Sequence, residues 1–137
     1  MGQASLGTAI YAGFTGNATL AALIGDRVYP YSSVPAKPTK PYLTFSRITN
    51  MRDNAQNGTM ATHAGARVQV DIYAETQATI DAICDALRTI CNTNAFTGGL
   101  RRLAWEGGPV DLPEYEPGAE QSTPHVAIDM MATYKES

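Results

Sequence analysis

A change of hydrophobic period between residues 67 and 91 constrains the fold more than any other feature of the sequence. Residues 67–73 read Arg-Val-Gln-Val-Asp-Ile-Tyr, with an apolar side chain at every second position, as in a strand with one buried face. Between Ile80 and Cys91 the apolar residues recur at intervals of three and four, which places them on one stripe of an α-helix. Only two residues separate the strand from Thr76, a suitable helix N-cap. The short connection predicts that the helix folds back over the apolar face of the strand.

Helix and strand patterns flank this unit on both sides. Residues 3–14 have helical spacing, and a second short helical segment follows Asn17 as its N-cap and stops at Gly25. Extended segments are predicted at residues 27–29, 42–48, 100–106 and 124–134. The pattern does not decide which face of 42–48 meets the helices. The order α-β-β-β-α-β-β predicts an α+β fold, with an antiparallel-rich sheet of four to five strands and helices packed on one face.

Three stretches lack a sustained period within what is predicted to be a single domain over residues 1–137. Residues 30–41 form a Pro-rich arm, whose four prolines favour extended or turning backbone. Residues 50–65 are predicted to be a long loop, and their mixture of Met and Arg with polar residues favours contact with a partner over a floppy hairpin tip. Residues 107–123 are predicted to be a second long loop, rich in proline and acidic side chains.

Composition excludes several classes of function. A net charge of −3 over 137 residues gives no general attraction to nucleic acid or to an anionic membrane. No run of about 18 apolar residues is present, so no membrane span is expected. The first charged residue is Asp26, so the N-terminus lacks the pattern of a secretory signal and cytoplasmic synthesis is expected.

The residues that could carry chemistry form no catalytic or metal-binding pattern. Cys84 and Cys91 lie two turns apart on the apolar helix stripe, roughly 10 Å from each other, which is too far for a disulfide. They are interpreted as buried, inert thiols, and a zinc site with His63 or His125 lacks ligand-like spacing. We therefore predict no catalytic, cofactor-binding or metal-binding residues.

Charged residues on the predicted strands have structural explanations. Asp71 and Asp129 alternate away from the apolar face, so they are interpreted as exposed or interface-paired carboxylates instead of a catalytic pair. His125 is interpreted as a strand-edge residue. Arg101 and Arg102 are adjacent on a strand, so they are expected to point to opposite faces and to form no basic patch by themselves.

Four segments taken together resemble a known family. They are Ala21–Pro30, Pro41–Ile48, Arg67–Ala74 with the helix stripe that follows, and the Tyr-Glu-Pro of the acidic loop before the last strand. Their order, from about Leu20 to Tyr134, resembles the tail-completion or tail-terminator family of long-tailed bacteriophages and related particles, also called head–tail joining proteins.

The resemblance implies a virion structural protein without enzymatic activity or cofactor. Its subunits would form a homo-oligomeric ring, expected to hold six copies, that caps the tail tube and joins it to the head connector or stopper protein. Double-stranded DNA would pass through the lumen without sequence-specific binding. The protein would be made in the host cytoplasm and reside in the virion tail, at the head–tail interface, with no membrane partner. Three alternatives stay open: a stopper or tail-tube subunit, a small enzyme with an unrecognised site, and a free-standing nucleic-acid binder.

Contacts between subunits are expected from the loops and from strand edges, because a ring joins two different patches of neighbouring copies. Met51 and Arg52 are the preferred anchors for contact along the axis with the next ring, since Met and Arg are enriched at interfaces. The interface residues expected in the 50–65 loop, the Pro-rich arm, the strand and the acidic loop are Met51, Arg52, Asn57, Met60 and His63; Tyr31 and Lys37; Arg101; and Tyr115.

Overall fold

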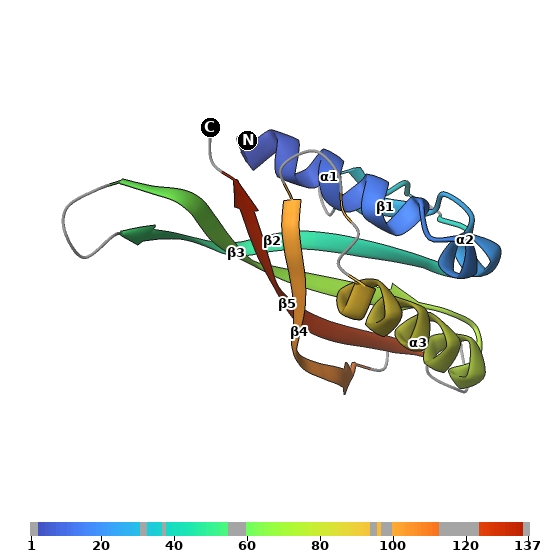
Figure 1. Cartoon of the computed structure of the whole chain (residues 1–137). Coiled ribbons are helices and arrows are strands. Elements are labelled where there is room, and N and C mark those ends of the chain that lie inside the picture. Colours follow the sequence, from blue (N-terminus) through green and yellow to red (C-terminus); the bar gives the residue numbers. More distant parts are fainter. Residues whose placement is uncertain are drawn as a thin grey trace.

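A five-stranded sheet carries helices on one of its faces (Figure 1). The computed structural model describes residues 3–30, 33–36, 38–54, 60–93, 96, 100–112 and 124–135, and it describes the backbone alone for residues 3–5, 47–54, 60–64 and 135. The elements in these ranges are α1 (Gln3–Thr15), α2 (Ala18–Ile24), β1 (Val28–Pro30), β2 (Tyr42–Asn54), β3 (Met60–Tyr73), α3 (Gln77–Thr93), β4 (Leu100–Asp111) and β5 (His125–Lys135).

The sheet has the strand order β1-β2-β3-β5-β4. The short β1 is parallel to β2, and the other three pairings are antiparallel. This confirms the predicted α+β fold with an antiparallel-rich sheet.

The helix ends follow the capping residues of the sequence. The Leu20 N–H donates to Asn17 Oδ1 at 2.9 Å, and Gly25 ends α2 with a φ of 62°. At α3 the Thr79 N–H donates to Thr76 Oγ1 at 3.2 Å. These predicted caps are confirmed.

One core lies between the helices and the sheet. The apolar stripe of α3, from Ile80 to Cys91, is buried against it, as the helical period predicts. Leu43 and Phe45 supply β2's part of this core, and Phe45 meets Phe14 of α1 edge-on at 6.5 Å between ring centroids. The face of residues 42–48 that the pattern left undecided is therefore the one that carries Leu43 and Phe45.

The prediction of a loop over residues 50–65 was wrong for the described part of it. β2 continues to Asn54 and β3 starts at Met60, with Arg52 paired to Ala64 and Met51 to Gly65. An antiparallel ladder is held by backbone hydrogen bonds, so it needs no apolar alternation where neither face packs on a core. We call residues 50–54 and 60–64 the hairpin extension; the part of it nearer the tip than the His63–Lys135 pair runs beyond the other strands (Figure 1). Residues 55–59 lie outside the described residues.

The second predicted loop was also too long. β4 continues to Asp111, past the boundary predicted at Glu106. Residues 107–109, two glycines and a proline, do not alternate between apolar and polar side chains. In this stretch β4 stays paired with β5 through register shifts, which a regular strand pattern does not predict. Residues 113–123 lie outside the described residues.

Candidate interaction surfaces

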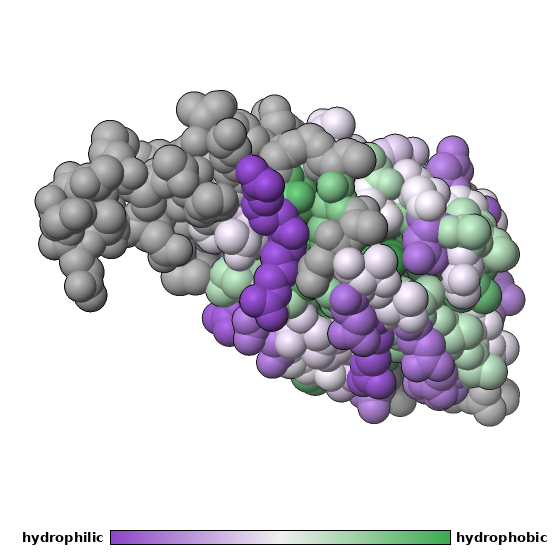
Figure 2. All heavy atoms as spheres, in the orientation of Figure 1, coloured by the Kyte–Doolittle hydropathy of each residue, from purple (hydrophilic) through white to green (hydrophobic). Residues whose placement is uncertain are grey.

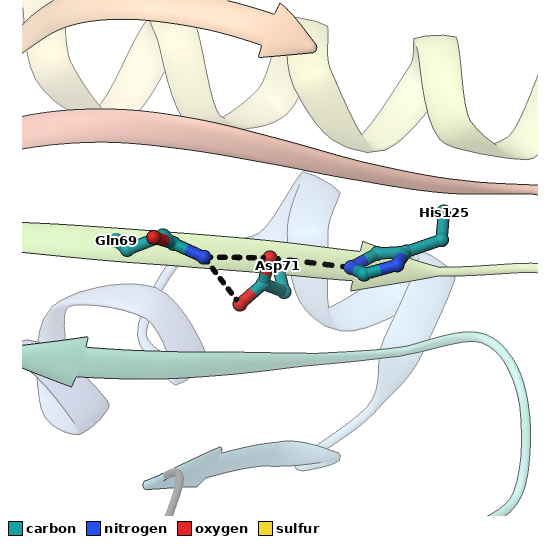
Figure 3. A network of polar contacts seen from close by, with 3 residues as sticks. All are labelled: Gln69, Asp71 and His125. Atoms are coloured by element: carbon teal, nitrogen blue, oxygen red, sulfur yellow. Dashed lines mark hydrogen bonds and ion pairs between the residues drawn. The ribbon is translucent and has the colours of Figure 1, made fainter. Parts of the chain in front are cut away.

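The face of the sheet opposite the helices holds a buried polar network (Figure 3). Asp71 Oδ1 lies 3.2 Å from His125 Nε2, and Gln69 Nε2 donates to both carboxylate oxygens at 3.1 Å. The Asp71 and His125 side chains are 9% and 8% exposed. The network spans β3 and β5, so it joins two strands by charge-assisted contacts.

Aromatic rings continue this network across the sheet. The His125 ring stacks on Tyr73 at 4.1 Å between centroids, and Tyr73 stacks on Tyr42 at 4.7 Å. Tyr42 lies 6.0 Å from Tyr29 of β1 in a tilted arrangement. Four strands thus contribute one ring each to a row that stiffens this end of the sheet.

This network tests two interpretations made from the sequence, one for Asp71 and one for His125. Asp71 was expected to be exposed or paired at an interface, whereas it is buried and paired within the chain. His125 begins β5, as expected, and its buried side chain pairs with Asp71. The period of a single strand gives its two faces but not the neighbouring strand that supplies a partner, so the sequence alone did not reveal the pairing.

The two cysteines belong to the core, as predicted. Cys84 and Cys91 are buried, and the Cys91 thiol lies 4.0 Å from the Met130 sulfur. Burial raises the pKa of each thiol to about 11; at Cys84 the nearby Arg88 opposes this rise. Both thiols are therefore protonated and unreactive at neutral pH.

No group of three or more His, Cys, Asp or Glu side chains in the described part of the chain is arranged to hold a metal ion. None of the described helices combines the length and the apolarity that crossing a membrane requires.

β4 presents arginines on the molecular surface. Arg101 and Arg102 are both exposed, and a register shift against β5 lies between Leu100 and Arg102. One extra residue in the strand interrupts the alternation of faces, so Leu100 and Leu103 are both buried while the two arginines between them reach solvent. Hydrophilic atoms follow the course of β4 in Figure 2.

Further along β4, Trp105 is fixed by two contacts. Its indole N–H donates to the Gly108 carbonyl oxygen at 3.2 Å, and the Arg88 guanidinium of α3 lies 4.7 Å from its ring centroid. Arg88 is thus occupied by a cation–π contact.

The structure brings some of the predicted interface residues together. Met51, Arg52, Met60 and His63 all belong to the hairpin extension, where Asn54 pairs with Met60 and His63 with Lys135. Arg101 is on β4, next to Leu100, and the ladders align Leu100 through Tyr134 of β5 with Ala64 of the hairpin extension. Asn57, Tyr31, Lys37 and Tyr115 lie outside the described residues. Arg67 and Arg102, which are both exposed, were not among the predicted interface residues, although the strand period of residues 67–73 places Arg67 on the polar face.

Comparisons with known proteins give a family and a fold. A family model described as "Tail completion protein gp17" matches residues 8–134. No curated protein matches the chain. A chain of a solved structure titled "Virion of native gene transfer agent (GTA) particle" is 21% identical, covers 98% of this chain and 100% of its own length, and superimposes with a TM-score of 0.62. At this identity the likeness establishes a shared fold.

Proposed function

Because the chain belongs to the tail completion protein gp17 family, we propose that it forms a ring that caps the tail tube and joins it to the head connector. Membership makes it a structural protein of a phage-type virion tail and not an enzyme. Six copies are the expected number in the ring. Double-stranded DNA passes through its lumen without sequence-specific binding.

The observation that carries this proposal is the extent of the family match. Residues 8–134 run from the first turns of α1 nearly to the end of β5, so the match includes every described helix and strand. The family assignment therefore concerns the whole fold and not one motif.

The strand edges of the sheet support a cyclic assembly. A ring uses a heterologous interface, in which one patch of a subunit meets a different patch of its neighbour. Among the described strands, β4 is paired only on its β5 side, and β1 covers β2 only at Leu43–Phe45. The two edges of the sheet are thus different, and each can contact a different neighbour.

The hairpin extension is the proposed contact along the ring axis. Its tip projects past the rest of the sheet (Figure 1), and its two strands carry Met51, Arg52, Met60 and His63, with Asn57 in the undescribed stretch between them. Paired strands give such a projection a defined direction, which a free loop lacks. Tyr31, Lys37, Arg101 and Tyr115 are proposed for contacts with neighbours in the same ring.

Imaging of the assembled particle by cryo-electron microscopy tests the proposal. The expected result is a single ring of this chain between tail tube and head connector, with its hairpin extensions on an axially adjacent ring. Copies stacked along the whole tail would identify a tube subunit and contradict the proposal. A chain that touches no second copy would contradict it as well.

A further inference from the structure

Three arginines on two strands form an exposed basic cluster. Arg101 and Arg102 lie on β4, and Arg67 of β3 pairs with Met131, which in turn pairs with Ala104. Arg67 and Arg102 therefore both lie on the helix-free face. They are two strands apart across the sheet and two residues apart along it, with roughly 12 Å between their Cα atoms. All three side chains are exposed, and in the part of the chain that the structure describes none of them forms an ion pair.

The outer face of α3 carries the opposite charge. Asp81 and Asp85 are exposed one helical turn apart, about 6 Å along the axis, and Glu75 is exposed just before the helix. Gln77 donates to Asp81 at 3.1 Å, but none of the three carboxylates forms an ion pair with a described residue. Arg88, the basic residue of this helix, is held over Trp105.

The two charged surfaces lie on different parts of the subunit. Figure 2 shows hydrophilic atoms along β4 and again over α3, with less hydrophilic residues between them. A heterologous contact needs two complementary patches on one chain, and these surfaces provide them.

We propose that, in the ring, Arg101 and Arg102 with Arg67 of one copy dock on the Glu75–Asp81–Asp85 surface of the next copy's α3. This inference rests on the proposed ring and adds the partner of the β4 arginines. Arginine suits such a contact because its planar guanidinium binds carboxylates in a bidentate manner.

The edge of β4 is better suited to contact a neighbour through its charged side chains than through backbone pairing with an added strand. A strand edge that accepts another strand must be regular, yet β4 has three register shifts against β5 and contains Pro109. Such features block edge-to-edge hydrogen bonding. The edge can still present charges, which set the choice of partner and its register.

A second copy is also the better occupant for the basic cluster than a nucleic acid. The chain as a whole carries −3, which opposes approach of a polyanion. The same chain supplies the carboxylates that the cluster needs, already exposed and without ion-pair partners among described residues.

Charge reversal tests the proposal in particle assembly. A strain that lacks the chain is complemented with Arg101→Glu/Arg102→Glu, with Asp81→Lys/Asp85→Lys, or with all four changes in one chain. Complete tailed particles are counted by electron microscopy. Each double variant is expected to lower the yield by about tenfold or more. The fourfold variant, which inverts four of the six charges and leaves Arg67 and Glu75 unchanged, is expected to recover a clear part of it. Asp26→Lys, at an exposed acid that belongs to neither surface, is the charge-reversal control and is expected to keep the wild-type yield.

The outcomes separate this inference from the proposed function. Thermal melting of each purified variant confirms that it folds, and the milder Asp81→Asn/Asp85→Asn replaces a variant that does not. If both double variants assemble normally, or if the fourfold variant does not recover, the α3 contact is wrong although the ring stands. Normal tails that fail to retain DNA in the Arg101→Glu/Arg102→Glu variant would assign the cluster to nucleic acid instead. If wild-type particles show no cyclic contact between copies, the proposed function fails first.

Discussion

One residue of β4, Gly108, allows the register of this strand to shift against β5. Gly108 has a φ of 95°, a backbone region that side chains disfavour, and a Cβ placed there would lie 2.7 Å from the Ala127 carbonyl oxygen. Its carbonyl also accepts the indole N–H of Trp105. Gly108 therefore allows β4 to shift its register beside β5 while holding Trp105 against Arg88.

Gly108→Ala is expected to destabilise the fold by about 1–3 kcal/mol, because the substitution adds a backbone clash to an unfavourable φ. Chemical denaturation monitored by circular dichroism measures the loss. Gly107→Ala is the matched control, since a Cβ there meets nothing within 4 Å and the backbone is not in the positive-φ region. Equal stabilities of the two variants would contradict this account of the turn.

The buried thiols predict a change of stability in alkali. Burial raises the pKa of Cys84 and Cys91 from an ordinary 9.0 to about 11, so the folded chain retains these protons when the unfolded chain loses them. Their contribution to stability is complete below pH 9 and is lost as the pH rises through 11. Urea denaturation between pH 8 and 11 should show a steeper loss for the wild type than for Cys84→Ala/Cys91→Ala.

The same thiols should resist alkylation in the folded protein. At pH 8 their thiolate fraction is about 100-fold lower than that of an ordinary cysteine. Iodoacetamide labelling followed by mass spectrometry should therefore be slower by at least about that factor in buffer than in urea. Rapid labelling of either cysteine in the native protein would show that α3 does not keep its stripe buried.

At the scale of elements, α3 and the core part of β3 have the secondary structure that their sequences predict, whereas the stretches predicted to be loops are partly strands. The α3 stripe is buried and its exposed side chains are polar, because a helix shows its packing face by period alone. The hairpin extension shows no such period, and backbone pairing joins its two strands. Met51, Arg52, Met60 and His63, which were predicted to lie in a loop, are therefore on paired strands, and their part in an interface stays a prediction.

β3 and β5 are also joined by the Asp71–His125 pair. Asp71→Ala should cost about 1–3 kcal/mol of unfolding free energy, because it leaves Gln69 and His125 without the carboxylate that they contact in a buried setting. Asp129→Ala on β5, a half-buried carboxylate on the same face, should cost less than half as much. Guanidinium chloride titration of both variants compares them, and a larger loss for Asp129→Ala would refute a structural role for the network.

At the scale of the whole molecule, the helices and the sheet form one packed body from which the hairpin extension projects (Figure 1). Within the described residues, β5 pairs with β3 only from His63 onwards, so the far part of the extension rests on the β2–β3 ladder alone. A segment with few contacts to the core contributes little to the stability of the subunit. Its length is better explained by contacts outside the subunit.

Replacing residues 53–63 by Asn-Gly, a favoured two-residue hairpin turn, should separate folding from assembly. The shortened chain keeps the Arg52–Ala64 pair and the core, so its melting temperature should stay within a few degrees of the wild type. Its yield of complete particles should fall sharply. Wild-type assembly by the shortened chain, which keeps Met51 and Arg52, would remove residues 53–63 from the proposed axial contact.

The sequence by itself determined the elements that a periodic stripe or a capping residue specifies: α3, the caps at Asn17 and Thr76, the core strand at residues 67–73 and the α+β class. These features are local, because side chains a few positions apart already share a face. Only the tertiary structure decided that Asp71 meets His125, that Arg101 and Arg102 both reach solvent, and that residues 50–54 and 60–65 are paired strands. Each of these depends on which strand lies beside which and in what register, and such contacts join residues far apart in the chain, where no local period records them.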